Sequence, residues 1–423
     1  AVQQMHEYVV CGLKGLVLPA GLHKQLLGED ALHQFPCLSG NFFQMSVRVH
    51  ADEAAKLDPR ADKECKPPGI RTARQLEKRH RRVGSTMKDN LNWAVLGTGV
   101  IANEMAQTLQ KMGKKLYAVG NRTHAKAVVF AEKYSIEMVY DCIDDMFLDE
   151  NVDIIYITSP HNTHFQFMEK ALTHGKHILV EKSITLNSTE LERMAALADA
   201  NHLIMAEAMT IWHMPLYKKL WEIVQSGALG KVQIMTLNFG SYKEYNMQNR
   251  FFNMNLAGGA MLDIGVYALS IVRSFMEETP TNILSQWKPS PTGSDEQATV
   301  LLQNSLGQMA TVALSMHSKQ PKRAMISCEK GYIEIMEYPR ADKAVIVDAE
   351  TGARTEVAAG STADALYYEM LDMEHAVQTR DASAMCLGYS RDVMDIMTRL
   401  RKEWGDEISG GGVGLRRRSE RHI

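Results

Sequence analysis

Histidine and lysine side chains follow two predicted strands of this sequence, and both residue types can take part in proton transfer. His161 and His164 come after the apolar run 153–158, and Glu181 and Lys182 end the next apolar run. A free imidazole titrates near neutral pH, and an ammonium group can hold negative charge on a substrate oxygen. Each histidine taken alone is better explained as a loop residue or a helix cap. Together with Lys182 they favour an active site at neighbouring strand ends.

A glycine turn lies earlier in the chain. Residues 93–96 read WAVL, which suits a buried parallel strand, and residues 97–99 read Gly-Thr-Gly. Apolar residues then recur at helical spacing, so the predicted helix begins directly at the turn. Free N–H groups and the positive end of the helix dipole would face one spot and form a phosphate site. With Ala102 the pattern is G-x-G-x-x-A, which indicates dinucleotide binding, although a glycine turn in any α/β protein would give the same match.

The end of the second predicted strand, 115–119, bears on the choice of cofactor. About twenty residues after the glycines, an Asp or Glu usually holds the ribose 2′-OH of NAD. The sequence has Asn121 and Arg122 there and no acid. Asn121 can donate hydrogen bonds, and Arg122 can stack on adenine or pair with a 2′-phosphate. We therefore expect NADP in preference to NAD, with NAD possible; the alternative is that Arg122 only ends a solvated turn.

The order of predicted elements indicates an α/β fold with two domains. In residues 87–208, strands alternate with helices such as 165–173, which predicts parallel βαβ units and a doubly wound Rossmann sheet. Residues 209–404 predict an α+β domain with a large, mostly antiparallel sheet. Its expected strands are 232–239, 298–304, 309–316, 324–328, 332–336 and 344–348. Helices between 363 and 403 are expected to return and pack against this sheet.

Six motifs resemble those of the glucose–fructose oxidoreductase / inositol dehydrogenase / MocA family, and within it the dihydrodiol dehydrogenase-like branch. They read GTGVIA, AVGNRT, ITSPHNTH, GKHILVEKS, MAEAMTIW and AGGAMLDIGVYAL, and they stand in the family's order between about residues 90 and 405. The resemblance implies hydride transfer between a nicotinamide cofactor and a carbon of a sugar, polyol or cyclic diol. It also implies that the outer face of the second domain's sheet makes a dimer interface.

The resemblance assigns roles to individual residues. The family's Glu-Lys-Pro motif is matched by Glu181, Lys182 and Ser183, so Lys182 is the expected catalytic lysine. In the second signature Asp263 and Tyr267 are matched, and Tyr267 is the expected acid/base. Ser183 departs from the family's proline, which restrains the backbone and makes a cis bond accessible. A serine at this position must instead be held by its surroundings.

The chemistry of these residue types agrees with alcohol oxidation. A free tyrosine has a pKa of about 10, too high for a base at neutral pH. A nearby Lys182 ammonium is expected to lower the pKa of Tyr267 by favouring the phenolate. Asp263 precedes Tyr267 by one helical turn, so it would share its face and could orient the substrate or the lysine.

The predicted site residues form two sets, and no metal site is predicted. His161 and His164 fall where the resembling branch has active-site histidines, and Glu207 is expected near the nicotinamide. The catalytic set is Lys182, Tyr267, Asp263 and His164. The cofactor-binding set is Gly97, Thr98, Gly99, Val100, Ile101, Asn121, Arg122, Ser159, Pro160, His161, His164, Glu181, Lys182 and Glu207.

Two other functions occur on the resembling scaffold. One is a glycoside hydrolase that uses bound NAD as a transient oxidant, so that no net redox change occurs. The other is a regulator that senses a sugar or NADP without reacting. The presence of Lys182, Asp263 and Tyr267 together argues against the regulator. The sequence does not name the substrate, because side chains of the second domain decide it.

Whole-chain properties exclude several classes. The chain has 423 residues, 45% of them hydrophobic, and a net charge of −3, which gives no basic surface for nucleic acid. No apolar run is expected to reach membrane-spanning length. Six cysteines show no metal or disulfide spacing, so we expect reduced thiols in a cytoplasmic protein. The resemblance implies a homodimer or a dimer of dimers. Residues 1–86 and 405–423 are expected to be disordered or non-native extensions, because they lack periodic apolar patterns.

Overall fold

The computed structural model describes residues 8–10, 17–19 and 90–406. The chain divides into two compact units, Ala1–Glu64 and Cys65–Ile423, and each is described by itself. In the first unit, β1 (Tyr8–Val10) and β2 (Val17–Pro19) pair as antiparallel strands. The rest of the predicted extension 1–86, and the predicted tail beyond residue 406, lie outside the described residues.

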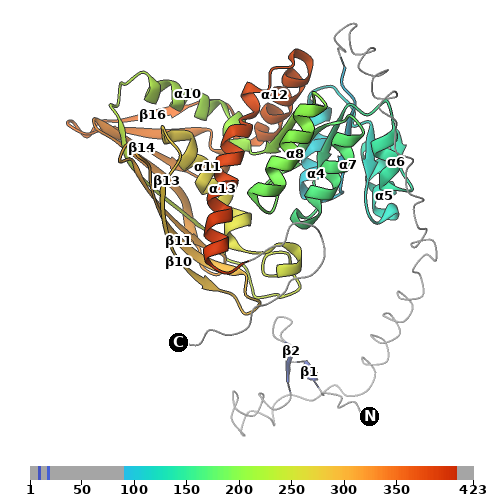
Figure 1. The fold of residues 1–423 in the computed structure, drawn as a ribbon, viewed down its shortest axis with the longest axis horizontal. Coiled ribbons are helices and arrows are strands. Elements are labelled where there is room, and N and C mark those ends of the chain that lie inside the picture. The colour runs from blue at the N-terminus through green and yellow to red at the C-terminus, as the bar shows by residue number, and fades with distance from the viewer. Residues whose placement is uncertain (1–7, 11–16, 20–89, 407–423) are drawn as a thin grey trace. The chain divides into compact units, whose positions relative to one another are not determined.

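The first half of the second unit is a Rossmann domain (Figure 1). Its elements are β3 (Trp93–Leu96), α4 (Val100–Lys111), β4 (Ala118–Gly120), α5 (His124–Tyr134), β5 (Met138–Val139), α6 (Ile143–Leu148), β6 (Ile154–Ile157), η2 (His161–Thr163), α7 (His164–Thr173), β7 (His177–Glu181), α8 (Ser188–Ala200) and β8 (Met205–Ala208). The described strands of this sheet all pair in parallel, in the order β5-β4-β3-β6-β7-β8. The predicted doubly wound sheet is confirmed.

The central strands of this sheet are buried, and the two sequence motifs lie where the strand order reverses. Strands β3 and β6 are buried along their whole length, because helices cover both faces of a parallel sheet. The strand order reverses between β3 and β6, and this is where ligands of doubly wound sheets bind, beyond the carboxyl ends of the strands. The glycine turn follows β3 and the two histidines follow β6, so both motifs lie at the reversal point.

The second domain is built on a large sheet. Its elements are α9 (Thr210–His213), α10 (Pro215–Gln225), β9 (Val232–Gly240), η3 (Met254–Leu256), the π-helical turn η4 (Met261–Gly265), α11 (Val266–Phe275), β10 (Asn282–Pro289), β11 (Asp295–Gln303), β12 (Met309–Ser315), β13 (Gln320–Cys328), β14 (Gly331–Met336), η5 (Tyr338–Arg340), β15 (Lys343–Asp348), β16 (Arg354–Ala358), η6 (Thr362–Asp364), α12 (Ala365–Thr379), η7 (Ser383–Met385) and α13 (Leu387–Glu403).

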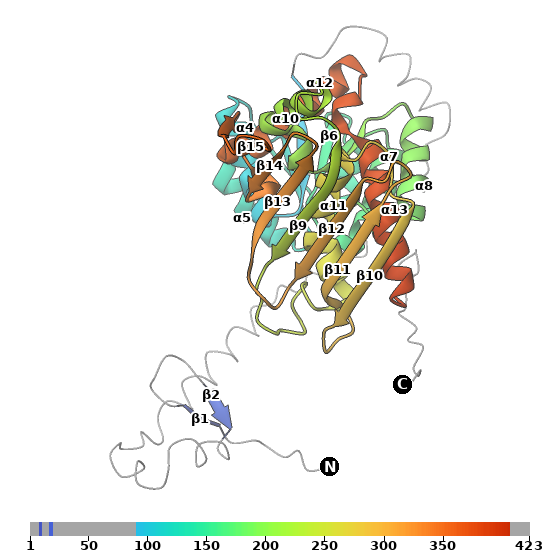
Figure 2. The same ribbon diagram turned by 90° about the vertical axis from the view of Figure 1, so that its left-hand side faces the viewer.

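The described strands of this second sheet run in the order β10-β11-β12-β9-β13-β14-β15-β16. Only β9 and β12 pair in parallel, so the predicted mostly antiparallel sheet is confirmed. Helix α11 packs against β9, β12 and β13 on one face of the sheet. Figure 2 shows the opposite face, which no described helix covers.

The last two helices, α12 and α13, pack on different parts of the fold. Helix α13 lies between α8 and α11 (Figure 1), whereas α12 packs on the Rossmann sheet beside α4. Leu366, Met370 and Met373 of α12 are buried in the same core as Val95. Glu374 also accepts a hydrogen bond from the Trp93 indole at 2.9 Å. The expectation that both helices return to the antiparallel sheet is therefore wrong for α12, because its apolar face fits the Rossmann core.

One helical stretch is long and apolar enough to cross a membrane, although the sequence was expected to contain no apolar run of that length. The stretch is Met254–Phe275, and 72% of the apolar 18-residue segment within it is buried inside the protein. The stretch is also interrupted, because Ala257 has a left-handed φ of 56°. It carries Asp263 and Tyr267 in the domain interior, and we assign it to the protein core.

The cysteines also depart from the expectation of reduced thiols. Among the described residues, Cys328 and Cys386 are free thiols, whereas Cys142 is disulfide-bonded. The prediction is wrong for Cys142, because sequence spacing does not show which cysteines come within bonding distance in the fold.

Candidate active site

The turn between β3 and α4 has the geometry of a phosphate site. Gly97 has φ +120°, and a Cβ atom there would lie 2.5 Å from the Thr158 hydroxyl oxygen, so only glycine fits. Gly99 begins α4 without a side-chain cap, no acid stands in the first turn, and a Cβ on Gly99 would meet open space. The first N–H groups of α4 are therefore free for an anion, and this cradle fits the pyrophosphate of a dinucleotide.

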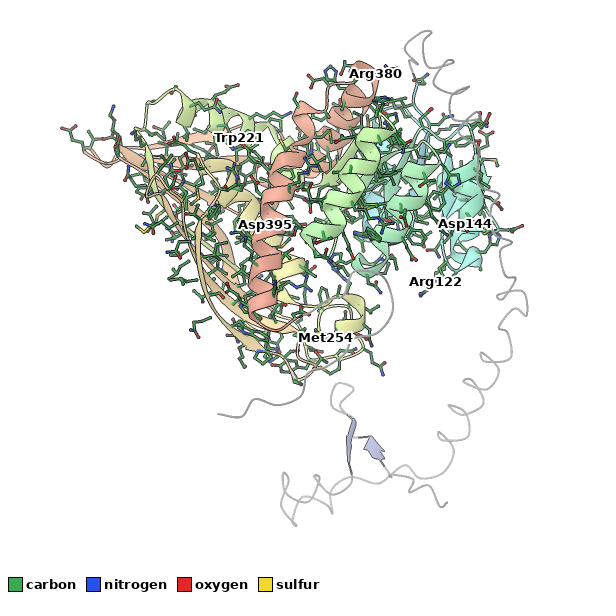
Figure 3. All side chains as sticks on the ribbon, viewed as in Figure 1. Arg122, Asp144, Trp221, Met254, Arg380 and Asp395 are labelled. Carbon is green, nitrogen blue, oxygen red and sulfur yellow. The ribbon has the colours of Figure 1, made fainter. Side chains whose placement is uncertain are left out.

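The predicted cofactor residues around this turn are partly open to solvent. Val100 is 76% exposed at the start of α4 although it is apolar. Asn121 follows β4 and donates to the Thr123 carbonyl at 3.0 Å. Arg122 is exposed, and Figure 3 shows its side chain at the edge of the Rossmann domain, directed away from the protein. It is free to contact a ligand that extends from the glycine turn.

Lys182 stands at the centre of the predicted catalytic set. Its Nζ donates to the carbonyl oxygen of Asp263 at 2.6 Å and to the Asp263 carboxylate at 3.1 Å. The same nitrogen lies 4.9 Å from the centroid of the Tyr267 ring. Burial lowers the pKa of Lys182, but the charges of Asp263 and Tyr267 raise it more, so the pKa lies above its ordinary value. Lys182 is therefore a fixed cation.

Asp263 is the anion that holds this cation. Burial raises the pKa of the Asp263 carboxyl, whereas the charges of Lys182 and Arg250 lower it more, to about 2. Its oxygen also accepts from Arg250 at 3.3 Å. The turn that carries it is π-helical rather than α-helical, yet Asp263 and Tyr267 both contact Lys182. The expected convergence of these three residues is thus present.

Tyr267 is half-buried on α11, and its hydroxyl makes no hydrogen bond to another described residue. Burial raises the pKa of Tyr267 above its ordinary value, and the lowering effect of Lys182 only partly offsets this. The predicted net lowering of the pKa of Tyr267 is therefore wrong in this structure, because desolvation outweighs the lysine. The direction of the lysine's influence is as expected.

The two histidines reach the site in different ways. The Nε2 atom of His161 lies 2.9 Å from the Lys182 carbonyl oxygen, and its ring is half-buried. Burial and the charges of His164 and Lys182 lower the pKa of His161 to about 3, so it is neutral. His164 is fully buried, with Nε2 facing the Ser159 carbonyl at 2.8 Å and Nδ1 facing that of Ser183 at 3.1 Å. This geometry favours a structural role for His164 over the expected catalytic one.

The segment after Lys182 is held from several sides. The Lys182–Ser183 peptide bond is cis. Ser183 is fully buried, and its hydroxyl donates to the Leu262 carbonyl at 2.9 Å. Serine at the family's proline position is thus fixed by a hydrogen bond to the turn that carries Asp263.

Glu207 supports this segment rather than facing open space. Its two carboxylate oxygens accept from the Ile184 N–H at 3.1 Å and from the Ser390 hydroxyl at 2.8 Å. Only 1% of Glu207 is exposed, and burial raises its pKa to about 7 against the lowering effect of these hydrogen bonds. The structure places Glu207 behind the catalytic segment, so the predicted cofactor contact has no support in its surroundings.

The structure adds residues that sequence reasoning missed. Arg250 contacts Asp263, and Arg340 bonds Glu104 of α4 at 3.0 Å. Glu369 of α12 is fully buried beside the Tyr156 hydroxyl. No local pattern marks these residues, since each reaches the site from a different element.

Comparison with known families agrees with this geometry. Residues 91–209 match the model of an oxidoreductase family with an NAD-binding Rossmann fold, GFO/IDH/MocA, and residues 217–334 match a GFO/IDH/MocA C-terminal domain. Together these two matches cover more than half of the chain.

Similar proteins include trans-1,2-dihydrobenzene-1,2-diol dehydrogenases. That of Xenopus tropicalis is 27% identical over 262 residues, which are 61% of this chain and 79% of the relative. The enzyme of Homo sapiens is 28% identical over 250 residues, 58% of this chain and 74% of the relative.

Solved structures share the fold at lower identity. A 3-ketoreductase from Actinomadura kijaniata in complex with NADP and TDP-benzene has a TM-score of 0.68 and 18% identity, and the match covers 74% of this chain and 98% of that one. A UDP-N-acetylglucosamine 3-dehydrogenase from Acidithiobacillus ferrooxidans has a TM-score of 0.65 and 18% identity over 75% and 98% of the two chains.

Proposed function

This chain belongs to the GFO/IDH/MocA family of oxidoreductases, and we propose that it interconverts a secondary alcohol and a ketone on a sugar, polyol or cyclic diol. The observation that carries the proposal is the arrangement of Lys182 between Asp263 and Tyr267, beside a glycine turn that fits a dinucleotide. A nicotinamide cofactor, when bound, would accept or supply the hydride.

Three side chains have separate roles in the proton transfer and in stabilising the substrate oxygen. In the oxidation direction Tyr267 removes the hydroxyl proton of the substrate, since its own hydroxyl is free for a ligand. Lys182 stabilises the negative oxygen, and its charge favours the phenolate of Tyr267. Asp263 fixes the position of the ammonium through two contacts. In the reverse direction Tyr267 returns the proton to the forming alkoxide.

We propose a ring carbon as the reacting position. The similar dihydrobenzenediol dehydrogenases are named for a hydroxyl on a six-membered ring. A sugar or cyclic polyol offers the same secondary alcohol. For the cofactor, the exposed Arg122 and the lack of an acid after β4 support NADP in preference to NAD.

A turnover assay tests the function. The chain is mixed with NADP or NAD and a panel of sugars, polyols and cyclic diols, and the near-ultraviolet absorbance of reduced nicotinamide is followed. A sustained absorbance rise supports the dehydrogenase. Cleavage of a glycoside without net absorbance change would indicate the hydrolase instead. Tight cofactor binding with no reaction of any compound would indicate a regulator.

We also propose that the chain forms a homodimer through the open face of the second sheet. Leu284 and Leu301 are paired across β10 and β11 and are 57% and 47% exposed. Met309 and Met336, on neighbouring rows of the same face, are 43% and 48% exposed. A surface of exposed leucine and methionine on an uncovered sheet is typical of a protein–protein interface.

A further inference from the structure

We propose that Glu369 is a positioning residue for this reaction, the protonated end of a hydrogen-bond chain that runs through Tyr156 to Glu181 and fixes the charge beside Lys182. The proposal rests on the proposed dehydrogenase function. Glu369 lies on α12, and Glu181 is the last residue of β7, directly before Lys182. The hydrogen bonds therefore connect helix α12 to the residue that directly precedes Lys182.

The hydrogen count determines where the proton lies. The Tyr156 hydroxyl is 2.6 Å from Glu181 Oε1 and 3.4 Å from Glu369 Oε1. A phenol has one hydrogen to donate, and the shorter contact takes it. With that hydrogen donated to Glu181, the phenol oxygen can face Glu369 Oε1 only as an acceptor, so a hydrogen bond across this contact places its hydrogen on the Glu369 carboxyl. The order of donation is Glu369 to Tyr156 to Glu181.

The surroundings of Glu369 agree with a neutral carboxyl. Its side chain is fully buried, and its second oxygen, Oε2, has no hydrogen-bond partner among the described residues. A carboxylate with a bare oxygen in such a place is strongly disfavoured. Burial raises the pKa of Glu369 well above its ordinary value, and the charge of Glu181 adds to this, while Arg340 opposes it.

The charged groups that face Glu369 come from several elements. They are Glu181 of β7, Arg340 of η5 and Asp372 of its own helix, together with the hydroxyl of Tyr156 on β6. Arg340 is already paired with Glu104 at 3.0 Å. A second buried anion beside Glu181 would therefore lack its own cation.

The charge of Glu181 matters for catalysis because it acts on both catalytic groups. It raises the pKa of Lys182 and that of Tyr267. Burial raises the pKa of Glu181 above its ordinary value, and the hydrogen bond from the Tyr156 hydroxyl opposes this increase. By donating a hydrogen bond to the far side of the Tyr156 oxygen, Glu369 orients the phenol toward Glu181 and favours the ionised form of that carboxyl. Glu369 itself touches neither substrate nor cofactor.

The first experiment is independent of activity. The infrared difference spectrum between the full-length wild type and Glu369→Gln should show a protonated-carboxyl band at neutral pH, because the other buried carboxyl groups cancel in the difference. As pH rises, the Glu369 carboxyl ionises in the unfolded protein but keeps its proton in the folded protein. The folding equilibrium constant of the wild type relative to that of Glu369→Gln should therefore fall by up to tenfold per pH unit. Glu374→Gln, on the same helix but with its carboxylate paired with Lys114, is the matched control and should give no such difference band.

The second experiment uses Tyr156→Phe, which keeps the ring and removes the middle hydroxyl. The pKa of Glu181 should rise, its charge should decrease, and the acidic limb of the kcat/KM profile for alcohol oxidation should move to lower pH by about one unit. An unchanged infrared band in Glu369→Gln, or an unmoved limb in Tyr156→Phe, would overturn the proposal. If no alcohol reacts at all, the proposed function fails, while the infrared and stability measurements still decide the state of Glu369.

Discussion

The ammonium group of Lys182 is bounded by an anion on one side and an aromatic ring on the other, and both neighbours keep it charged. The carboxylate of Asp263 lies at 3.1 Å and the centroid of the Tyr267 ring at 4.9 Å. A charged lysine that cannot leave this position supplies a constant field to a tyrosine and a binding point for a substrate oxygen.

Replacing Tyr267 with Phe tests the proton transfer. The ring still packs, so the fold should survive, while kcat should fall by about 10²–10⁴, the usual contribution of a placed acid or base. Cofactor affinity, measured by fluorescence titration, should change little. Lys182→Met should lower kcat by at least as much, because the substrate oxygen and Tyr267 both lose the nearby positive charge.

The double variant is the control for this pair. Residues that act as a unit are not additive, so Tyr267→Phe with Lys182→Met should be little worse than the worse single variant. Near-normal turnover of Tyr267→Phe would show that another group moves the proton. His161, which is neutral and half-buried beside Lys182, would then be the group to replace next.

The raised pKa of Tyr267 predicts opposite pH dependence for the two directions. Alcohol oxidation needs the phenolate, whose population rises with pH up to a pKa that lies above the ordinary value. Its kcat/KM should therefore still rise through the mildly alkaline range. Ketone reduction needs the protonated phenol, which predominates at neutral pH, so its rate should stay level there. Initial rates in both directions across this range check the sign; a level profile for oxidation would contradict it.

Arg122 predicts the cofactor preference. Arg122→Ala should weaken the binding of NADP by about 1.5–3 kcal/mol, as for a lost hydrogen bond to a charged group. The binding of NAD should be weakened far less. Dissociation constants for both cofactors measure this. Lys126→Ala is the matched control, because it removes another exposed cation from α5. Equal losses for both cofactors in Arg122→Ala would contradict a 2′-phosphate contact.

At the scale of elements, the turn that carries Asp263 is anchored from the sheet. Asp295 of β11 accepts from the Met261 N–H at 2.6 Å, and a Cβ atom on Gly259 would lie 1.9 Å from its other oxygen. Burial raises the pKa of Asp295 from 3.8 to about 7, against the lowering effect of the Met261 hydrogen bond. The turn that carries Asp263 is thus anchored by a carboxyl group that is costly to ionise.

Asp295→Asn therefore predicts a pH-dependent gain in stability. Between the ordinary and the raised pKa the unfolded wild type has lost its proton while the folded protein keeps it, so the free energy of unfolding decreases as pH rises. The asparagine does not titrate, and the stability of the variant relative to wild type should increase by up to roughly 4 kcal/mol across this window. Urea unfolding at acidic and neutral pH measures it; a constant difference would show that Asp295 ionises normally.

At the scale of the whole molecule, the open sheet face predicts self-association. Light scattering should give twice the chain mass for the wild type. Leu301→Arg places a charge in the middle of the exposed rows and should shift the protein to the monomer at the same concentration. Val129→Arg is the matched control, since Val129 is 65% exposed on α5 of the Rossmann domain. A monomeric wild type, or equal effects of both variants, would contradict this interface.

Local pattern alone determined the architecture. The strands and glycine turn of the Rossmann domain and the antiparallel sheet were predicted, because burial periodicity and glycine conformation depend on near neighbours in the chain. The roles of Lys182, Asp263 and Tyr267 came instead from the resemblance of their motifs to those of the family. Strand ends in a parallel sheet meet at one edge, so the two histidines and Lys182 could also be placed together from their order.

Tertiary structure decided the electrostatics and the packing of distant segments. Whether burial or Lys182 controls the pKa of Tyr267 depends on how deeply α11 is covered, which no local pattern records. Glu207 and His164 face Ser390 and Ser183, which come from other parts of the fold, and these contacts favour a supporting role for both residues. Glu369 reaches Tyr156 across 213 positions of sequence. Such contacts arise only when the chain folds, because desolvation and charge pairing depend on distance in space rather than on separation along the sequence.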